Sequence, residues 1–183
     1  KMKLLRVGNF GSEKPAVLDK KGEIRDLSQH LIDFNSSTLN FETLERLKKI
    51  NLDSLPKVPV SSRIGSCIAK PGKFLAVGLN YSDHVAETNA QIPKEPIIFN
   101  KAANSMIGPN DNIILPKLSK KLDWEVEIAF IVGKNAKYIS EENAHNYILG
   151  YCIVNDISER EWQKERGGTW DKGKSGDTFG PTG

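Results

Sequence analysis

Two glutamates separated by one residue have the spacing of a paired ligand set. In DWEVEIAFIV (123–132), a β-strand would place Glu125 and Glu127 on one face, with α-carbons about 6.6 Å apart. Carboxylates about 5 Å apart repel each other by about 1 kcal/mol in water and about 3 kcal/mol at an effective dielectric constant of 20. A solvated acidic face tolerates that repulsion, but the apolar continuation AFIV (129–132) predicts a strand covered on both sides. A buried pair requires a cation or raised pKa values.

A third carboxylate closes another apolar segment. In GYCIVNDIS (150–158), Asp156 follows a predicted strand, where it is either a metal ligand or the cap of the helix expected after it. A donor set made only of carboxylates favours a hard cation over zinc, with Mg²⁺ first and then Mn²⁺ or Ca²⁺. Glu125, Glu127 and Asp156 are therefore the candidate metal ligands.

A histidine and a glutamate share one face of a predicted helix. In NYSDHVAE (80–87), His84 and Glu87 are three residues apart, which is close enough for the carboxylate to orient the imidazole. This is the arrangement of a general-base dyad, and it is also that of an ordinary surface pair near a helix start. Tyr81 is either a ligand contact or a residue packed at a strand end.

A phosphate-binding pattern occurs near residue 170 but lacks its context. GTWDKGKS (168–175) fits G-x-x-x-x-G-K-[ST], which requires an apolar strand before it and a helix after it. The polar helical segment EREWQKER (159–166) precedes it, and glycines with a proline follow it, so the flanks argue against a nucleotide site. Lys174 is expected in a flexible polar loop, where its ammonium would meet a ligand anion.

The elements that position these residues follow a small N-terminal unit. KLLRVGNF (3–10) and PAVLDKKGEIRDL (15–27) predict strands with a hairpin, and the stretch 38–50 predicts an amphipathic helix. The helix buries its apolar residues at every third position, namely Phe41, Leu44, Leu47 and Ile50. A proline-bearing connector follows, so we place a boundary near residue 69, with domains at 1–69 and 70–183.

The second domain alternates predicted strands and helices. The strands are expected at 73–81, where the apolar run suggests burial, and at 96–101, 112–116, 123–134 and 150–158. The helices are expected at 81–88, 140–149 and 159–166, and the glycine-rich segment 167–183 is expected to be a loop.

Composition excludes several classes of protein. The 183 residues carry a net charge of only +3, with basic and acidic residues interspersed, so no basic stripe suggests a nucleic-acid partner. No apolar run approaches the length of about 18 residues that a membrane span needs, and no secretory signal is seen. Cys67 and Cys152 show neither metal-ligand spacing nor a disulfide framework, so we expect small buried thiols in a reducing cytoplasm.

Taken together, these segments resemble the fumarylacetoacetate hydrolase family. The matching stretches are VGLNYSDHVAE (77–87), PIIFNKAANSMIGPND (96–111), DWEVEIAFIVGK (123–134), GYCIVNDISEREWQ (150–163) and GKSGDTFGPTG (173–183). The resemblance implies an α+β protein with a small N-terminal β-rich domain and a catalytic domain of mixed β-roll architecture. The family's catalytic domain is longer, so we expect 70–183 to be its N-terminal portion only.

The resemblance also assigns roles to particular residues. Glu125, Glu127 and Asp156 would bind Mg²⁺ or Mn²⁺, and His84 with Glu87 would activate water on a mobile lid. Lys174 would add a second positive charge at the reacting centre. The remaining substrate-site positions are Tyr81, Lys101, Ser105, Arg160 and Gln163, of which Arg160 would pair with a substrate carboxylate. Gly176 stands where relatives often carry a larger side chain.

The implied reaction is hydrolytic cleavage of a C–C bond in a 2-oxo or β-diketo acid through an enolate on the metal. Within the family, the pattern is nearest to bacterial members acting on sugar-derived diketo acids, such as 2,4-diketo-3-deoxy-L-fuconate hydrolase, and to sequences labelled ureidoglycolate lyase. Isomerisation, decarboxylation and lyase chemistry on the same site stay open, as does a metal- or nucleotide-binding module without turnover. The expected partners are a small-molecule acid and a second copy in a homodimer.

Overall fold

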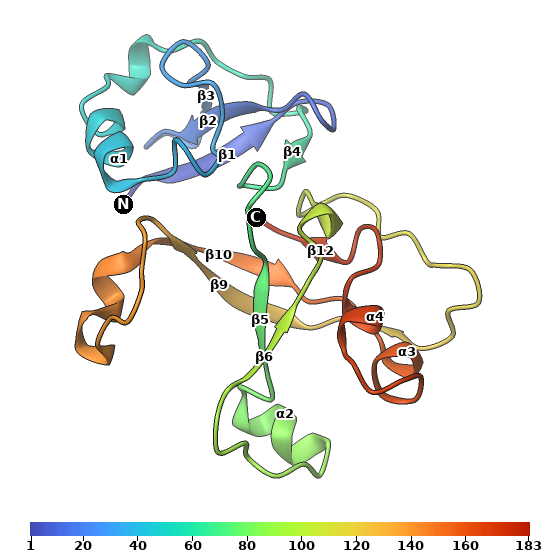
Figure 1. Ribbon diagram of the computed structural model, residues 1–183. Coiled ribbons are helices and arrows are strands. Elements are labelled where there is room, and N and C mark those ends of the chain that lie inside the picture. Colours follow the sequence, from blue (N-terminus) through green and yellow to red (C-terminus); the bar gives the residue numbers. More distant parts are fainter.

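The computed structural model describes residues 1–183 and shows an α+β chain in two parts, one above the other in Figure 1. The first part is a four-stranded antiparallel sheet in the order β3-β2-β1-β4, with two short helical segments. Its strands are β1 (Lys3–Val7), β2 (Lys14–Leu18), β3 (Ile24–Asp26) and β4 (Ile64–Gly65), and its helices are α1 (Phe41–Leu47) and η1 (Leu52–Ser54).

The core of this first part confirms the predicted hairpin and corrects the predicted helix. Its main apolar cluster joins Val17, Leu27, Leu31, Phe34, Leu47 and Leu55. The Asn40 side chain accepts a hydrogen bond from Thr43 N–H at 2.8 Å, so α1 begins later than expected. The predicted apolar stripe is confirmed at Leu47, which is buried, but it is wrong at Phe41, which is 37% exposed. The helix buries the polar residue Thr43 as well.

The second part contains four two-stranded sheets in place of one continuous sheet. β5 pairs with β6, β9 with β10 and β8 with β11, all antiparallel, whereas β7 and β12 are parallel. Its strands are β5 (Leu75–Gly78), β6 (Ile97–Asn100), β7 (Met106–Ile107), β8 (Leu122–Asp123), β9 (Val126–Val132), β10 (Ile148–Asn155), β11 (Ser158–Glu159) and β12 (Gly180–Pro181). Its helices are α2 (Ser82–Glu87), η2 (Ala103–Ser105), η3 (Glu141–Tyr147), α3 (Arg160–Lys164) and α4 (Asp171–Lys174).

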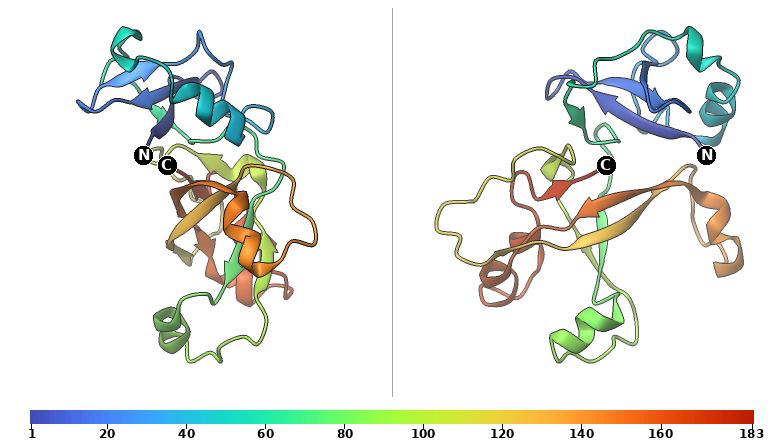
Figure 2. Two further views of the ribbon diagram at one scale, coloured as in Figure 1. Left: turned by 90° about the vertical axis from the view of Figure 1, so that its left-hand side faces the viewer. Right: turned by 180° about the vertical axis from the view of Figure 1, so that it is seen from behind.

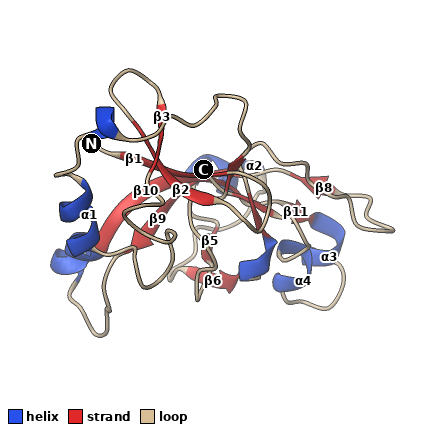
Figure 3. Cartoon of the chain, turned by 90° about the horizontal axis from the view of Figure 1, so that it is seen from above, coloured by secondary structure: helices blue, strands red, loops and turns tan.

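The ribbon views show how these elements are arranged. In Figures 1 and 2 the long β9–β10 ribbon crosses the β5–β6 pair, and α2 lies at the far end of that pair, away from the N-terminal sheet. Seen from above in Figure 3, α1 lies at one end of the molecule and α3 with α4 at the other. None of the helices has both the length and the apolar character needed to cross a lipid bilayer.

Two predictions for the second part are wrong, and a third is confirmed only in part. Residues 112–116 form no strand, because Ile114 directs its N–H to the Thr178 hydroxyl at 2.8 Å and no neighbouring strand pairs with it. The expected helix 140–149 is a 3₁₀ helix that ends at Tyr147, after which the chain enters β10. The expected loop 167–183 contains α4 and the two-residue strand β12.

The predicted burial of β9 is also wrong on one of its faces. Its side chains alternate as expected, with Glu127, Ala129 and Ile131 on the less exposed face. The opposite face is open because no other element of the chain packs against it, and β5 is likewise only partly buried. The exposed apolar residues are Val126, Ile128, Phe130 and Val132 of β9, together with Tyr151 and Ile153 of β10.

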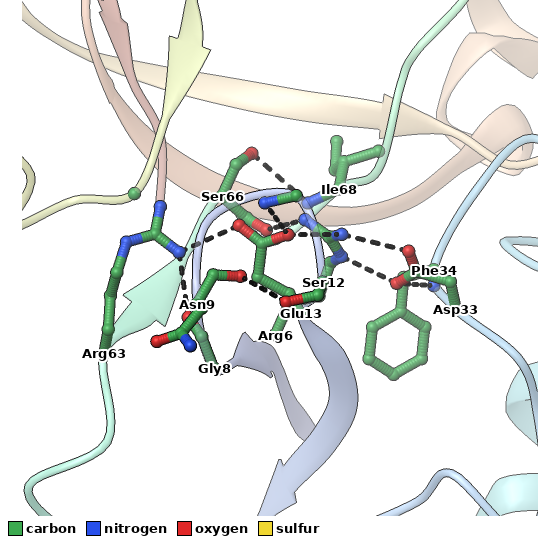
Figure 4. Close-up of polar contacts among 12 residues, drawn as sticks. Arg6, Gly8, Asn9, Ser12, Glu13, Asp33, Phe34, Arg63, Ser66 and Ile68 are labelled. Atoms are coloured by element: carbon green, nitrogen blue, oxygen red, sulfur yellow. Dashed lines mark hydrogen bonds and ion pairs between the residues drawn. The ribbon is translucent and has the colours of Figure 1, made fainter.

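A network of ion pairs connects the two parts, and Figure 4 shows the portion of this network around Arg6, Glu13 and Arg63. Glu13 accepts from Arg6 at 3.2 Å and from Arg63 at 2.8 Å, and Arg6 also pairs with Asp33 at 2.6 Å. Arg63 extends the network to Asp111 of the second part. Burial alone would raise the pKa of Glu13, but the hydrogen bond from Arg63 and the positive charge of Arg6 lower it below its ordinary value. The domain boundary near residue 69 stays a prediction.

Candidate metal centre and active site

Strand pairing brings the three predicted metal ligands together. Glu127 lies within β9 opposite Val154 of β10, and Asp156 follows directly after β10. The Asp156 N–H donates to the Glu125 carbonyl at 2.8 Å, and the Glu125 N–H donates to the Asn155 side chain at 3.0 Å. As a result, one carboxylate oxygen from each of Glu125, Glu127 and Asp156 lies within 4.8 Å of the others.

The three carboxylates differ in how their charge is compensated. Burial raises the pKa of Glu127 to about 7, and the negative charges of Asp156 and Glu125 add to the effect. Burial also acts to raise the pKa of Glu125, but the charges and hydrogen bonds of Lys174 and Arg160 together outweigh burial and lower that pKa. Glu127 makes no ion pair with a basic side chain, so a divalent cation beside it would supply the missing positive charge. The donor set therefore fits a hard metal ion.

Two buried lysines contact the carboxylates from the protein side. Lys174 Nζ lies 2.8 Å from Glu125 Oε2 and 2.7 Å from Asp156 Oδ2. Lys101 Nζ lies 2.6 Å from Asp156 Oδ1, as an ion pair without hydrogen-bond geometry, and donates to the Lys174 carbonyl at 2.5 Å. Burial lowers the pKa of Lys101 in spite of the nearby Asp156 charge. Each lysine is only 2% exposed.

The predicted setting of Lys174 in a flexible loop is therefore wrong. Lys174 belongs to α4, which packs against α3 without a side chain between them at Gly173. A Cβ atom at Gly173 would lie 2.5 Å from the Gln163 nitrogen and 2.6 Å from the Glu159 carbonyl oxygen. The second glycine of the phosphate-loop pattern thus serves helix packing, and it allows Lys174 to reach the acidic cluster.

Arg160 is engaged by protein groups on every side. Its guanidinium pairs with Asp123 at 2.7 Å and with Glu125, and Nη1 donates to Gln163 Oε1 at 3.0 Å. These contacts hold Glu125 in place beside the other two carboxylates. The expected pairing of Arg160 with a substrate carboxylate stays a prediction. In this structure, Nε and Nη2 of the guanidinium both donate to Asp123 Oδ2.

Glu159 supports this site and was missed in the sequence. Its side chain is fully buried and accepts hydrogen bonds from the backbone N–H groups of Lys121 at 2.7 Å and Trp162 at 2.8 Å. Burial acts to raise the pKa of Glu159, but these hydrogen bonds lower it. Its carboxylate caps α3 and fixes the segment before β8, so it positions Arg160 from two directions. An acid three residues before Trp162 at a helix start was the available signal.

The predicted dyad lies on α2 at the wall of a cavity of about 640 Å³ that also contains the carboxylates. His84 is half-buried and Glu87 is exposed, and no hydrogen bond joins them. Tyr81 lines the same cavity and its hydroxyl accepts from Ile128 N–H at 3.4 Å. Arg160, Gln163 and Lys174 complete the polar wall.

A second cleft of about 870 Å³ lies between α1 and η3. None of its lining residues is an acid, a histidine or a cysteine.

Lys101 and Ser105 lie behind the cavity wall, where they do not line it. Lys101 reaches Asp156 from that side, whereas the fully buried Ser105 hydroxyl has no hydrogen-bond partner.

The structure also explains why a glycine stands at position 176, because a Cβ atom there would lie 2.8 Å from the Phe179 ring. A larger residue at Gly176 would require Phe179, which is fully buried, to move.

Comparisons with known proteins agree with this architecture. Residues 73–183 match the family model described as "Fumarylacetoacetate (FAA) hydrolase C-terminal". A protein named "Putative hydrolase" from Burkholderia ambifaria is 53% identical over 182 residues, which are 100% of this chain and 64% of that protein. The chain thus spans about 64% of the length of the curated relatives it matches.

Solved structures show the same likeness. A fumarylacetoacetate hydrolase from Exiguobacterium antarcticum is 30% identical with a TM-score of 0.79, over 99% of this chain and 64% of that one. A probable 2-hydroxyhepta-2,4-diene-1,7-dioate isomerase from Mycobacterium abscessus is 31% identical with a TM-score of 0.73, over 98% of this chain and 62% of that one. Because the family model covers more than half of its residues, the chain belongs to the fumarylacetoacetate hydrolase family.

Proposed function

We propose that the protein is a divalent-metal-dependent hydrolase that cleaves a C–C bond in a 2-oxo or β-diketo acid. The observation that carries this proposal is the cluster of Glu125, Glu127 and Asp156, whose oxygens lie within 4.8 Å of one another in the wall of the cavity. The raised pKa of Glu127, caused by burial and by the two neighbouring acids, supports a cation at this point.

The three carboxylates would hold Mg²⁺ or Mn²⁺, because hard ions prefer oxygen donors. When bound, the ion supplies a Lewis acid that stabilises negative charge developing on substrate oxygens. Lys174 is placed to add a second positive charge, since its ammonium already lies between Glu125 and Asp156. Lys101 balances the other oxygen of Asp156 from behind and keeps that ligand oriented.

His84, which lines the same cavity as the carboxylates, would take a proton from water. The water oxygen would then attack the substrate carbonyl, and the adjacent C–C bond would break as the tetrahedral intermediate collapses. The bonding electrons would pass to the 2-oxo fragment as an enolate, and the carbon released would take up the proton held by His84. Glu87, one turn away on α2, would orient the imidazole after a change of side-chain rotamers brings the two groups into contact. Tyr81 and Gln163 line the same cavity as the dyad and the carboxylates and would contact the substrate.

Substitution of His84 tests the hydrolytic assignment. In the full-length protein, His84→Ala is expected to lower kcat for acylpyruvate or diketo-acid cleavage by about 10²–10⁴-fold, the range typical of a general base. Calorimetry with Mg²⁺ should show unchanged ion affinity, because His84 is not among the ligands. His145→Ala, at an exposed position of η3, is the matched control. Unchanged turnover in His84→Ala would remove this residue from the mechanism.

Isomerisation is the second candidate. The absence of a hydrogen bond between His84 and Glu87 favours it, because an isomerase needs no activated water. One solved relative is also named as an isomerase of an unsaturated dioate. Product analysis by mass spectrometry separates the reactions, since hydrolysis adds water and yields two fragments, whereas isomerisation leaves the mass unchanged.

A nucleotide-binding role without turnover is tested by calorimetry in the presence of Mg²⁺, with oxalate and ATP as the two ligands compared. Binding of ATP without binding of oxalate would favour the nucleotide-binding role.

A further inference from the structure

The cleft between α1 and η3 is separate from the cavity that contains the carboxylates. The two share no lining residue. The volume of the cleft, about 870 Å³, is in the range of sites that hold small molecules. Figures 1 and 2 show the orange segment η3 on the same side of the molecule as α1. Both parts of the chain therefore contribute to the cleft.

The charge of this cleft is entirely positive. Lys134 and Lys137 are the only charged residues that line it, whereas the acids of η3, Glu141 and Glu142, do not. Neither lysine forms an ion pair with an acidic side chain of the chain. Two ammonium groups in a cleft without an acid favour an anionic ligand.

Aromatic rings stand where acidic partners would be expected. Lys134 Nζ lies 4.3 Å from the centre of the Tyr147 ring and 5.7 Å from the centre of the Phe41 ring. Lys137 Nζ lies 5.3 Å from the centre of the Tyr138 ring. An aromatic face attracts a cation but does not neutralise it, so both charges stay available to an anion. The same rings offer a planar apolar surface beside the charges.

Backbone packing assembles these groups without a ligand. Gly133 ends β9, and a Cβ atom there would lie 2.8 Å from the Leu149 side chain and 3.1 Å from the Phe41 ring. Its N–H donates to the Tyr147 carbonyl at 2.9 Å. The end of β9 is therefore fixed against α1 and against the end of η3, which brings Lys134 between the two rings. A site that is already assembled loses little entropy on binding.

Tyr138 occupies a strained position on this cleft. Its φ of 52° lies in the left-handed region, which favours glycine. The side chain is 96% exposed, so Tyr138 gains no core packing that would offset the strain. Strained residues of this kind cluster where a ligand is bound. A ligand that stacks on the ring would account for a tyrosine at this position.

We propose that the cleft binds a small planar carboxylate, whose charge pairs with Lys134 and Lys137 and whose unsaturated body stacks on Tyr138. The positive charge selects an anion, the exposed ring selects a planar body, and the volume selects a small molecule. The ligand would contact both α1 and η3 and so link the two parts of the chain. The proposal does not depend on the reaction at the carboxylate cluster.

NMR titration of the full-length protein with benzoate tests this site. A chelator is present, so that no metal ion at the carboxylate cluster binds the probe. We expect saturable binding that Lys134→Ala and Lys137→Ala each weaken by about 3–10-fold. Lys20→Ala, at an exposed position between β2 and β3, is the matched control and should leave the affinity unchanged.

Two further probes and one further variant test the ligand class. Benzamide has the same ring without the charge, and cyclohexanecarboxylate has the same charge without a planar ring, so both should bind more weakly than benzoate. Tyr138→Gly should also weaken benzoate binding. It should not lower the urea midpoint, because glycine adopts a φ of 52° without strain.

The proposal has four contrary outcomes, each of which would overturn it. Benzoate shows no saturable binding, or it binds equally well to Lys134→Ala, Lys137→Ala and Lys20→Ala. Benzamide binds as tightly as benzoate, which would exclude recognition of the charge. Cyclohexanecarboxylate binds as tightly as benzoate, which would exclude recognition of the planar body.

Discussion

Replacing Glu127 with glutamine should change stability in a direction that depends on pH. In the metal-free protein, the pKa of Glu127 rises from its ordinary value of 4.5 to about 7 because of burial and of the neighbouring acids. Folding therefore favours the protonated side chain. That contribution is present below pH 4.5 and is lost as the pH rises to about 7.

The size of the effect follows from the same shift. The rise in the pKa of Glu127 from 4.5 to about 7 corresponds to at most about 3.5 kcal/mol, at about 1.4 kcal/mol per pKa unit. Solvent reaches this half-buried carboxylate and screens part of the effect, so we expect about 1–2 kcal/mol. Glutamine carries no charge, so at pH 8 metal-free Glu127→Gln should unfold at higher urea concentration than the unmodified protein. At pH 4.5 the two proteins should be equal.

Equilibrium urea denaturation of the full-length protein, with a chelator present, measures this difference. Added Mg²⁺ should reverse the order at pH 8, because only the unmodified protein keeps all three ligands and gains stability from the ion. Glu142→Gln, at an exposed position of η3, is the matched control and should change nothing at either pH. An equal gain for Glu127→Gln at both pH values would refute the reasoning, since a packing effect does not depend on ionisation.

Two further substitutions test the supports of the site. Gly173→Ala places a methyl group 2.5 Å from the Gln163 nitrogen, so it should lower the free energy of unfolding by about 1–3 kcal/mol in urea denaturation. Gly72→Ala is the control and should not lower it, because no atom lies within 4 Å of the added methyl group. Equal stability of the two variants would contradict the close helix packing. Glu159→Gln exchanges one buried acceptor for a donor that faces backbone N–H groups. It should lower the free energy of unfolding by about 1–3 kcal/mol and weaken Mg²⁺ binding in calorimetry. Glu165→Gln, at an exposed position, is the control. Intact Mg²⁺ affinity in Glu159→Gln would separate Glu159 from the positioning of Arg160.

The residues that sequence reasoning located best are those tied to strand periodicity. The alternation of DWEVEIAFIV placed Glu125 and Glu127 on one face, and the end of the next apolar segment supplied Asp156. Both rest on a local rule, because successive side chains of a strand point to opposite faces. The carboxylate cluster was therefore predictable from two short segments, once their pairing was assumed.

The surroundings of the cluster depend on contacts that no local pattern encodes. Lys174 reaches Asp156 only because Gly173 lets α4 approach α3, and the glycine-rich sequence around it resembles an unstructured loop. Residues 112–116 have the composition of a strand but find no partner to pair with. Cys67 and Cys152 are both partly exposed, so the burial expected from their residue type is wrong.

The antiparallel alignment of β9 with β10 makes strand register a condition for assembling the acidic cluster. Glu127 stands opposite Val154, and the one irregularity of the ladder lies at the other end, between Ile148 and Gly150. A slip by one residue would turn every β9 side chain to the opposite face and carry Glu127 away from Asp156. Insertions in the connection 133–147 should therefore spare ion binding, whereas one residue added within 128–131 should abolish it.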